Sequence, residues 1–286
     1  MTKRSSSEAS LPPVSKQLTG GFRIFNRRYL RKHFHAIAFS AEQEETRHIS
    51  ESDSVVVYAN HASWWDPLLA IFLAESLLPK HGMYAPIDAE AFEKYKIFGK
   101  MGFYPIAQNS LQGAKDFLRV SRSILSQPAT SVWVTPEGRF ADARDHDAEL
   151  MPGLAHLGYA IQNARKDEME ENEPSVNAPV VWFVPTAIEY VFWEEKKPEI
   201  LVRFGQAIRS DTIQLENKAA WAKALTENLR QAQRDLAQLS IARDTESFEL
   251  LLRSKSGTFF LYDWWRTSMS RFTGSGSMRT EHSDKF

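Results

Sequence analysis

The sequence of 286 residues contains no cysteine. This absence excludes disulfide bridges, thiolate metal sites and a cysteine nucleophile, and with them a secreted fold that depends on disulfides. No stretch reaches the roughly 20 consecutive apolar residues that a helix needs to cross a bilayer. Residues 1–17 are polar and rich in serine, without the apolar centre of a signal peptide. We therefore expect a location in the cytoplasm or, as a peripheral or monotopic protein, on the cytoplasmic face of a membrane.

An excess of charge of one sign is also lacking. The chain has 35 Lys and Arg against 36 Asp and Glu, and its formal net charge is −1. A nucleic-acid-binding protein normally presents a strongly basic face, so this balance argues against nucleic acid as a partner. Hydrophobic residues make up 43% of the chain, which is enough for a sizeable core. The length fits one or two domains, and one large domain with appendages fits equally well.

Short apolar runs alternate with segments of helical periodicity through the middle of the chain. We expect strands at residues 55–59, 82–86, 102–107, 131–135, 180–190 and 200–204. We expect helices at residues 67–78, 89–100, 113–126, 153–165 and 219–239. This alternation predicts an α/β fold in which a central mixed sheet is flanked by helices.

Residues 20–40 carry five Lys or Arg and no acid. On a helical wheel the apolar side chains fall on one arc (Phe22, Phe25, Tyr29, Leu30, Ala36 and Ile37), and the basic ones fill the other. The pattern predicts an amphipathic, membrane-associated helix whose cations meet anionic lipid. The alternative is a helix that packs on the domain and leaves its basic face in solvent.

The remaining segments are polar or aromatic. We expect residues 1–19 to form a disordered lead and residues 165–178 to form a charged, exposed loop. Residues 246–286 are an aromatic C-terminal segment with a polar tail, and we expect its cluster of Phe259, Phe260, Tyr262, Trp264 and Trp265 to pack or to contact membrane.

The segment from Asn60 to Asp66 directly follows a predicted buried strand. The Asp66 carboxylate can accept a hydrogen bond from one ring nitrogen of His61, and the other nitrogen is then free to take a proton from a hydroxyl. Two other interpretations stay open for the pair alone. Asp66 before Pro67 also fits a helix N-cap, and His61 also fits an ordinary loop histidine.

Four blocks in order resemble the glycerolipid, or lysophospholipid, acyltransferase family, typified by enzymes that acylate lysophosphatidic acid. N-H-x-x-x-x-D is matched by Asn60, His61 and Asp66, and Gly102 to Gln108 partly match a second block that ends in Arg in the family. Pro136-Glu137-Gly138 match the third block, which then diverges to Arg139-Phe140, and Val184-Pro185 match the fourth. The resemblance spans residues 55–190 and implies an acyltransferase domain at residues 41–245.

The resemblance implies that His61 is the general base and Asp66 its orienting partner. The acceptor hydroxyl would attack acyl-CoA or acyl carrier protein directly, with no metal and no bound cofactor, because the thioester is a substrate. Asn60, Gln108, Glu137, Gly138 and Arg139 would bind substrate, and membrane lipid would be the other partner. Ser63 is an alternative nucleophile, although a small polar residue within the motif explains it as well.

Gln108 is the main departure from the family pattern. Phosphate-selective members have Arg at that position, and Gln supplies hydrogen bonds but no charge. Arg139 could compensate, or the acceptor could be a less charged lipid with a glycosylated or amino-acid headgroup. Arg139 and Arg144 could equally pair with Asp142, Asp145 or Asp147 on a solvated loop.

Two other classes of protein fit this sequence less well than an acyltransferase does. A non-catalytic lipid-binding scaffold would not require an intact His61–Asp66 pair. A lipid hydrolase would require a G-x-S-x-G elbow or a clustered metal set, and the sequence has neither. His146 and His156 lack metal-ligand spacing, and Trp64 and Trp65 fit core packing as well as an acyl channel or a membrane interface.

Overall fold

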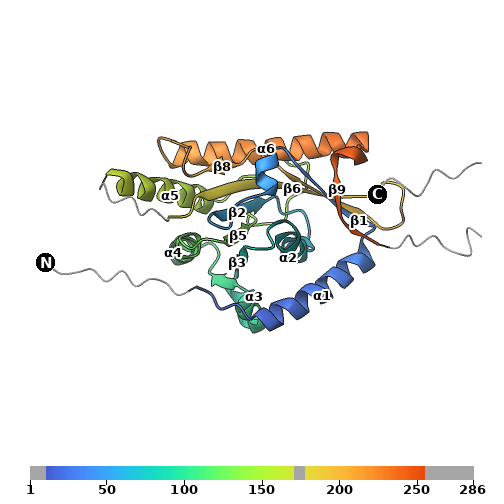
Figure 1. The fold of residues 1–286 in the computed structure, drawn as a ribbon, viewed down its shortest axis with the longest axis horizontal. Helices are drawn as coiled ribbons and strands as arrows, with labels where there is room; N and C mark the ends of the chain where they lie inside the picture. Colours follow the sequence, from blue (N-terminus) through green and yellow to red (C-terminus); the bar gives the residue numbers. More distant parts are fainter. Residues whose placement is uncertain (1–10, 171–177, 255–286) are drawn as a thin grey trace, which may run out of the picture.

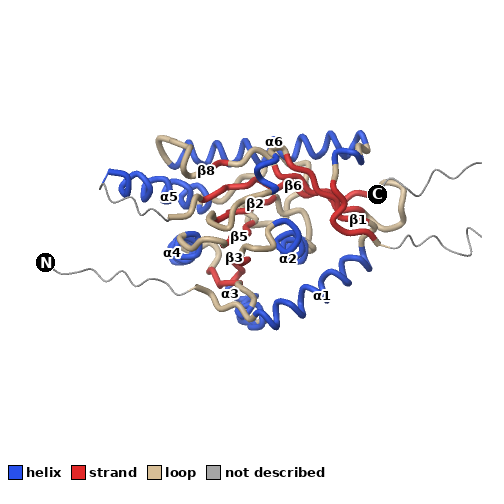
Figure 2. Tube along the Cα trace, viewed as in Figure 1, coloured by secondary structure: helices blue, strands red, loops and turns tan. Residues whose placement is uncertain are grey.

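A computed structural model describes residues 11–170 and 178–254 of the chain. Its strands form one mixed nine-stranded sheet in the order β4-β3-β5-β2-β6-β7-β1-β9, with β8 pairing β6. The strands from β4 to β6 run parallel to one another, whereas β7 is antiparallel to β6 and β9 is antiparallel to β1. The predicted α/β fold with a central mixed sheet is confirmed (Figure 2).

The elements have the following bounds. The α-helices are α1 Lys16–His33, α2 Asp66–Leu77, α3 Ala89–Lys94, α4 Leu111–Leu125, α5 Gly153–Glu170 and α6 Lys218–Ala242. Short 3₁₀ turns occupy Glu44–Arg47, Lys96–Lys100 and Thr245–Ser247. The strands are β1 Ala36–Ala41, β2 Ser54–Ala59, β3 Gly82–Asp88, β4 Phe103–Ile106, β5 Thr130–Val134, β6 Val181–Val191, β7 Glu199–Phe204, β8 Ile208–Arg209 and β9 Glu249–Arg253.

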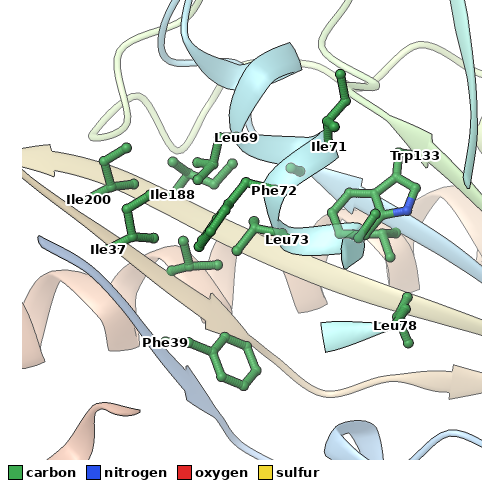
Figure 3. Packing of buried hydrophobic residues seen from close by; sticks show 14 of the residues in the cluster. Ile37, Phe39, Leu69, Ile71, Phe72, Leu73, Leu78, Trp133, Ile188 and Ile200 are labelled. Atoms are coloured by element: carbon green, nitrogen blue, oxygen red, sulfur yellow. The ribbon is translucent and has the colours of Figure 1, made fainter. Parts of the chain in front are cut away.

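Helices cover both faces of the sheet. Side chains alternate along a strand, so Val55 and Val57 of β2 pack with α2 while Val56 and Tyr58 pack with α4, α5 and α6. Figure 3 shows Phe72 of α2 beside the strand residues Ile37, Ile188 and Ile200. Figure 1 places α1 and α6 on opposite sides of the molecule. Because β2 is buried on both faces, its sequence is a continuous apolar run rather than an alternating one.

The helix predicted at residues 20–40 is shorter and lies earlier in the chain. Helix α1 begins at Lys16, where the Ser15 hydroxyl accepts from the Leu18 amide, and ends at His33. Residues 36–41 instead form β1, which pairs with β7 and β9. Ala36 and Ile37, which the helical wheel assigned to the helix, are buried in the sheet. The predicted disordered lead therefore includes the first turn of a helix at residues 16–19.

Other predicted boundaries also differ from those in the structure. The predicted loop at residues 165–178 begins inside α5, which continues to Glu170. The sheet extends beyond the predicted domain limits of 41 and 245, because β1 and β9 lie on either side of them. The aromatic cluster at residues 259–265 lies outside the described residues. None of the helices in the described ranges combines the length and apolar character needed to cross a membrane.

Candidate active site

The candidate residues meet at the carboxyl ends of parallel strands. Strand β2 pairs with β5 so that Tyr58 lies opposite Val134, which places His61 and Glu137 equally far beyond the ends of adjacent strands. Gln108 follows β4, which belongs to the same parallel set. In open α/β sheets, ligands bind at this edge, so the topology brings the sequence-predicted residues to the expected place.

His61 and Asp66 form a hydrogen-bonded pair. The Nδ1 atom of His61 lies 2.7 Å from Oδ2 of Asp66, and the same oxygen accepts from the Ser63 amide at 2.9 Å. Asp66 is the first residue of α2, and its buried carboxylate accepts these bonds rather than capping the helix. Within the described residues, Nε2 of His61 makes no hydrogen bond, so this nitrogen is left to accept a proton.

Tyr190 is a member of the site that sequence analysis missed. Its hydroxyl donates to Oδ1 of Asp66 at 2.6 Å from the end of β6. Burial and the adjacent Asp66 carboxylate raise the pKa of Tyr190 far above its usual range, so the hydroxyl stays a donor. The sequence does contain an indication of this role for Tyr190, because a polar aromatic residue ends the apolar run VVWFVPTAIEY.

The side chain of Asn60 points toward β6 of the sheet. Its side-chain Nδ2 donates to the Ile188 carbonyl at 3.1 Å, and its Oδ1 accepts from the Ile188 amide at 2.8 Å. The β2–β6 ladder stops at Ala59, so this side chain extends the pairing by one position. The buried amide therefore fixes where the chain leaves β2, and the geometry favours a positioning role over substrate binding.

Glu137 is buried beneath the same loop. Its Oε2 accepts from the His61 amide at 2.7 Å, and its Oε1 accepts from Nη1 of Arg230 in α6 at 2.8 Å. Both carboxylate oxygens are thus used inside the protein. Arg230 is a second residue that sequence analysis missed.

Gly138 has φ of +64°, a left-handed conformation that glycine adopts without strain. A Cβ atom there would lie 2.4 Å from the sulfur of Met151, a flexible side chain that would have to move, so the backbone conformation is the main reason for glycine. Gly138 also lines the cavity described next, which keeps it among the candidates for substrate contact.

A largely apolar cavity of about 490 Å³ opens at this edge of the sheet. Its volume lies in the range of small-molecule binding sites. His61 and Asp66 line it, as do Gln108 and apolar side chains from β3, β4, α2 and α4. Phe140 packs against the His61 ring with 4.4 Å between ring centroids. The histidine pair thus meets an apolar space of a size that suits a ligand.

The two candidate arginines lie on an exposed loop. Nη2 of Arg139 is 3.9 Å from Asp145, and Arg144 donates through Nε and Nη2 to the two oxygens of Asp142. The pairing that the sequence left open is therefore the one observed. Neither arginine lines the cavity, and its described lining contains Asp88 but no Lys or Arg.

Trp64 and Trp65 form part of a chain of aromatic contacts between α1 and the motif. Trp65 packs against Tyr29 and His33 of α1, and Trp64, which is 65% exposed, stands edge-on to Trp65. The hydroxyl of Ser63 accepts from the Trp65 amide. In the part of the chain that the structure describes, no three His, Asp or Glu side chains gather in a way that could hold a metal ion.

A family model described as Acyltransferase matches residues 40–183, which is half of the chain. The comparison with curated proteins finds no match. Among solved structures, the chain is similar to the crystal structure of the 1-acyl-sn-glycerophosphate (LPA) acyltransferase, PlsC, from Thermotoga maritima, at 12% sequence identity. That alignment covers 78% of this chain and 79% of the other, with a TM-score of 0.47.

Proposed function

Because the chain belongs to the acyltransferase family, we propose that it transfers a fatty acyl group from acyl-CoA or acyl carrier protein to the hydroxyl of a lysophospholipid-type acceptor. His61 is the general base of this proposal. The observation that carries it is the Nδ1–Asp66 hydrogen bond of 2.7 Å in a histidine that lines the apolar cavity.

The proposed reaction needs no acyl-enzyme. Nε2 of His61 takes the proton of the acceptor hydroxyl as its oxygen attacks the thioester carbonyl. The C–S bond then breaks, the thiolate leaves, and the proton on the imidazolium passes to the sulfur, so that an ester and a free thiol are formed. Asp66 stabilises the imidazolium in the intermediate step. In the described residues the Ser63 hydroxyl makes no hydrogen bond to His61 and accepts from the Trp65 amide, which supports leaving Ser63 out of the chemistry.

A second candidate acceptor is a less charged lipid with a glycosylated or amino-acid headgroup. Gln108 stands in the cavity where the family resemblance would place an arginine, and Asp88 lines the same cavity. The described lining offers a phosphate no Lys or Arg, whereas a neutral or amino headgroup could use Gln108 and the carboxylate as hydrogen-bonding partners. The charge of the cavity lining is the observation that supports this second candidate.

We also propose that the protein works peripherally at the cytoplasmic face of a membrane. Ile24 and Phe25 of α1 and Trp64 are each more than half exposed, and Arg28, Arg31 and Lys32 lie exposed on α1. Exposed aromatic and basic side chains together suit an anionic lipid surface. Lipid acceptors would then reach the site from that surface.

The first test is acceptor-dependent thiol release, followed with a thiol-reactive dye. Purified protein, an acyl-CoA or acyl carrier protein and a panel of lysolipids are mixed, and the protein adds no background because it has no cysteine. His61→Ala should lower turnover by about 10²- to 10⁴-fold, the usual contribution of a general base. The control is His48→Ala, whose side chain is 80% exposed. Turnover by His61→Ala close to that of the wild type would refute the mechanism.

The panel also separates the two acceptor classes. Gln108→Arg should shift preference toward phosphate-bearing lysolipids by about tenfold or more, since a charge-assisted bond contributes roughly 1.5–3 kcal/mol. Gln112→Arg is the matched control, because Gln112 bonds to Asp116 on α4 outside the cavity lining. An unchanged ranking of acceptors in Gln108→Arg would remove Gln108 from headgroup recognition.

A further inference from the structure

Arg230 is a buried cation in the middle of α6. Its side chain is 4% exposed and that of its partner Glu137 is 1% exposed. Nη1 of Arg230 donates to Oε1 of Glu137 at 2.8 Å and to Oε1 of Gln233 at 2.5 Å, and Nη2 donates to the Ala148 carbonyl. A charge removed from water in this way requires such partners, so the guanidinium is fixed in one position.

These bonds lead directly to the main chain of His61. The other oxygen of Glu137 accepts from the His61 amide at 2.7 Å. On its other side, the His61 carbonyl accepts from the Ala141 amide at 2.9 Å. The backbone of His61 is therefore held at both of its polar groups by the loop that follows β5.

Helix α6 holds that loop in turn. Nε2 of Gln233 donates to the Ala143 carbonyl at 2.9 Å, and Arg230 binds the Ala148 carbonyl. Two side chains one turn apart on α6 thus bond to two points of the loop, and one of them, Arg230, also bonds to Glu137. Asp66 and Tyr190 fix the ring of His61, whereas α6 fixes its backbone through Glu137.

We propose that Arg230 is a positioning residue that acts through Glu137 to hold the backbone of His61 where Nε2 can reach the acceptor hydroxyl. The inference rests on the proposed function, in which His61 is the general base. Its physical basis is that proton transfer and attack require reacting atoms at near-contact distance, and a misplacement of about 1 Å can cost about 10²-fold in rate. The ring bond to Asp66 cannot prevent such a shift if the backbone of His61 moves.

The alternative is that Arg230 only stabilises the fold, and kinetics separate the two roles. Arg230→Met should lower kcat at least tenfold, per folded molecule, with KM for acyl-CoA within twofold of the wild type. Arg230→Lys keeps the charge but has a single donor nitrogen in place of Nη1 and Nη2, and should recover part of the loss. The matched control is Arg234→Met, one turn further along α6, whose exposed guanidinium bonds to Gln231. It should stay within twofold of the wild type.

A spectroscopic readout makes the test independent of turnover. In protein labelled with ¹⁵N-histidine, the Nδ1 proton shared with Asp66 should give a downfield signal in the wild type and in Arg234→Met. In Arg230→Met, recorded well below the melting temperature, that signal should shift or broaden. Because an unpaired buried carboxylate can prevent folding, Arg230→Met combined with Glu137→Gln removes both charges and should show the same loss of kcat.

The outcomes are distinguishable. Wild-type kcat and an unchanged histidine signal in a folded Arg230→Met, or in the double variant, would overturn the inference and leave the role of His61 intact. Full turnover in His61→Ala would overturn the proposed function, and the histidine signal would still decide whether Arg230 positions His61. A fall in melting temperature with an unchanged kcat per folded molecule would assign Arg230 to stability alone.

Discussion

The Asp66 carboxylate accepts three hydrogen bonds in a buried position. His61 and Ser63 donate to one oxygen, and Tyr190 donates to the other. A carboxylate held at both oxygens has one orientation, because rotation would break bonds at each end. The direction of the His61 ring is therefore set by residues from β6 as well as by its own loop.

Tyr190→Phe tests this arrangement. It removes one donor from a buried carboxylate, so we expect a loss of about 1–3 kcal/mol of unfolding free energy. We also expect kcat to fall about tenfold with KM nearly unchanged, since an effect on the transition state alone lowers kcat. Urea unfolding and steady-state kinetics measure the two quantities.

The control is Tyr58→Phe, which loses a buried hydroxyl bonded to the Leu225 carbonyl. Its stability should fall without the change in kcat. Equal kcat in Tyr190→Phe and the wild type would show that Asp66 needs no third donor.

At the residue scale, a contact could be predicted from the sequence only where its partners lie close together along the chain. His61 and Asp66 lie five residues apart in one loop, so their pairing could be predicted from spacing and family resemblance. Arg230 is 93 residues from Glu137. It follows Leu229 and so lies about 100° further round the helix, outside the apolar stripe. Its burial comes from the loop after β5, and no local pattern reports that contact.

At the scale of elements, α1 has an inner and an outer face. The amide of Asn26 donates to the Leu68 carbonyl of α2, and Arg27 lies over the ring of Phe72. The outer face carries exposed Ile24 and Phe25 with several exposed basic residues. The two interpretations of this segment are therefore compatible, because one helix packs on the domain and still leaves a surface suited to lipid.

Charge reversal on that outer face tests membrane association without disturbing the core. Each basic residue near an anionic surface contributes about 1 kcal/mol, so Arg28→Glu, Arg31→Glu and Lys32→Glu together should weaken binding to anionic vesicles by about a hundredfold or more. Vesicle co-sedimentation measures the effect. The matched control reverses Lys218, Lys223 and Arg234, which are exposed on α6 on the opposite side of the molecule (Figure 1). Equal binding by the α1 variant and the control would place the lipid-binding surface elsewhere.

Deletion of residues 1–39 would be a poor test of membrane association. It would remove most of β1, which lies between β7 and β9 in the sheet. Strand β1 was missed because the short apolar run from Ala36 continues the composition of the helix before it, and periodicity cannot separate strand from helix in so few residues. Strand β9 was missed because its pairing with β1 depends on residues more than 200 positions away. Helices α2, α4, α5 and α6 and the strands of the parallel set were predicted well, because their patterns are local. The helix expected at residues 89–100 is instead α3 followed by a 3₁₀ turn.

At the scale of the whole molecule, histidines outside the site connect folding to pH. His35 and His81 are buried, and burial lowers the pKa of each. Lys197 and Arg253 lower the pKa of His35 further while Glu195 opposes them, and Asp53 and Glu51 oppose the shift at His81. Burial and Lys218 also lower the pKa of His156. In the unfolded chain all three would titrate near 6.5.

The sign of the resulting pH dependence follows from proton binding. As the pH falls through about 6.5, the unfolded chain protonates these histidines to a greater extent than the folded protein does, because their pKa values are lower in the folded state. The unfolded state then binds more protons, so the free energy of unfolding should fall between pH 7.5 and pH 5.5. Burial raises the pKa of Glu189 and Glu199, which acts in the opposite direction at the acid end of this range. A comparison of variants is therefore sharper than the slope of the wild type.

Urea unfolding at pH 7.5, 6.5 and 5.5 should show a smaller loss of stability in His81→Gln than in the wild type. Gln can still donate to the Ser50 carbonyl, which Nε2 of His81 contacts at 3.2 Å, but it cannot take up a proton. The combination of His35→Gln, His81→Gln and His156→Gln should flatten the dependence further. His48→Gln, at an exposed position, should keep the wild-type slope. A triple variant with the wild-type slope would mean that these histidines do not cause the acid sensitivity. A carboxylate whose pKa is lowered in the fold, such as Asp211 beside Arg209, should then be substituted next.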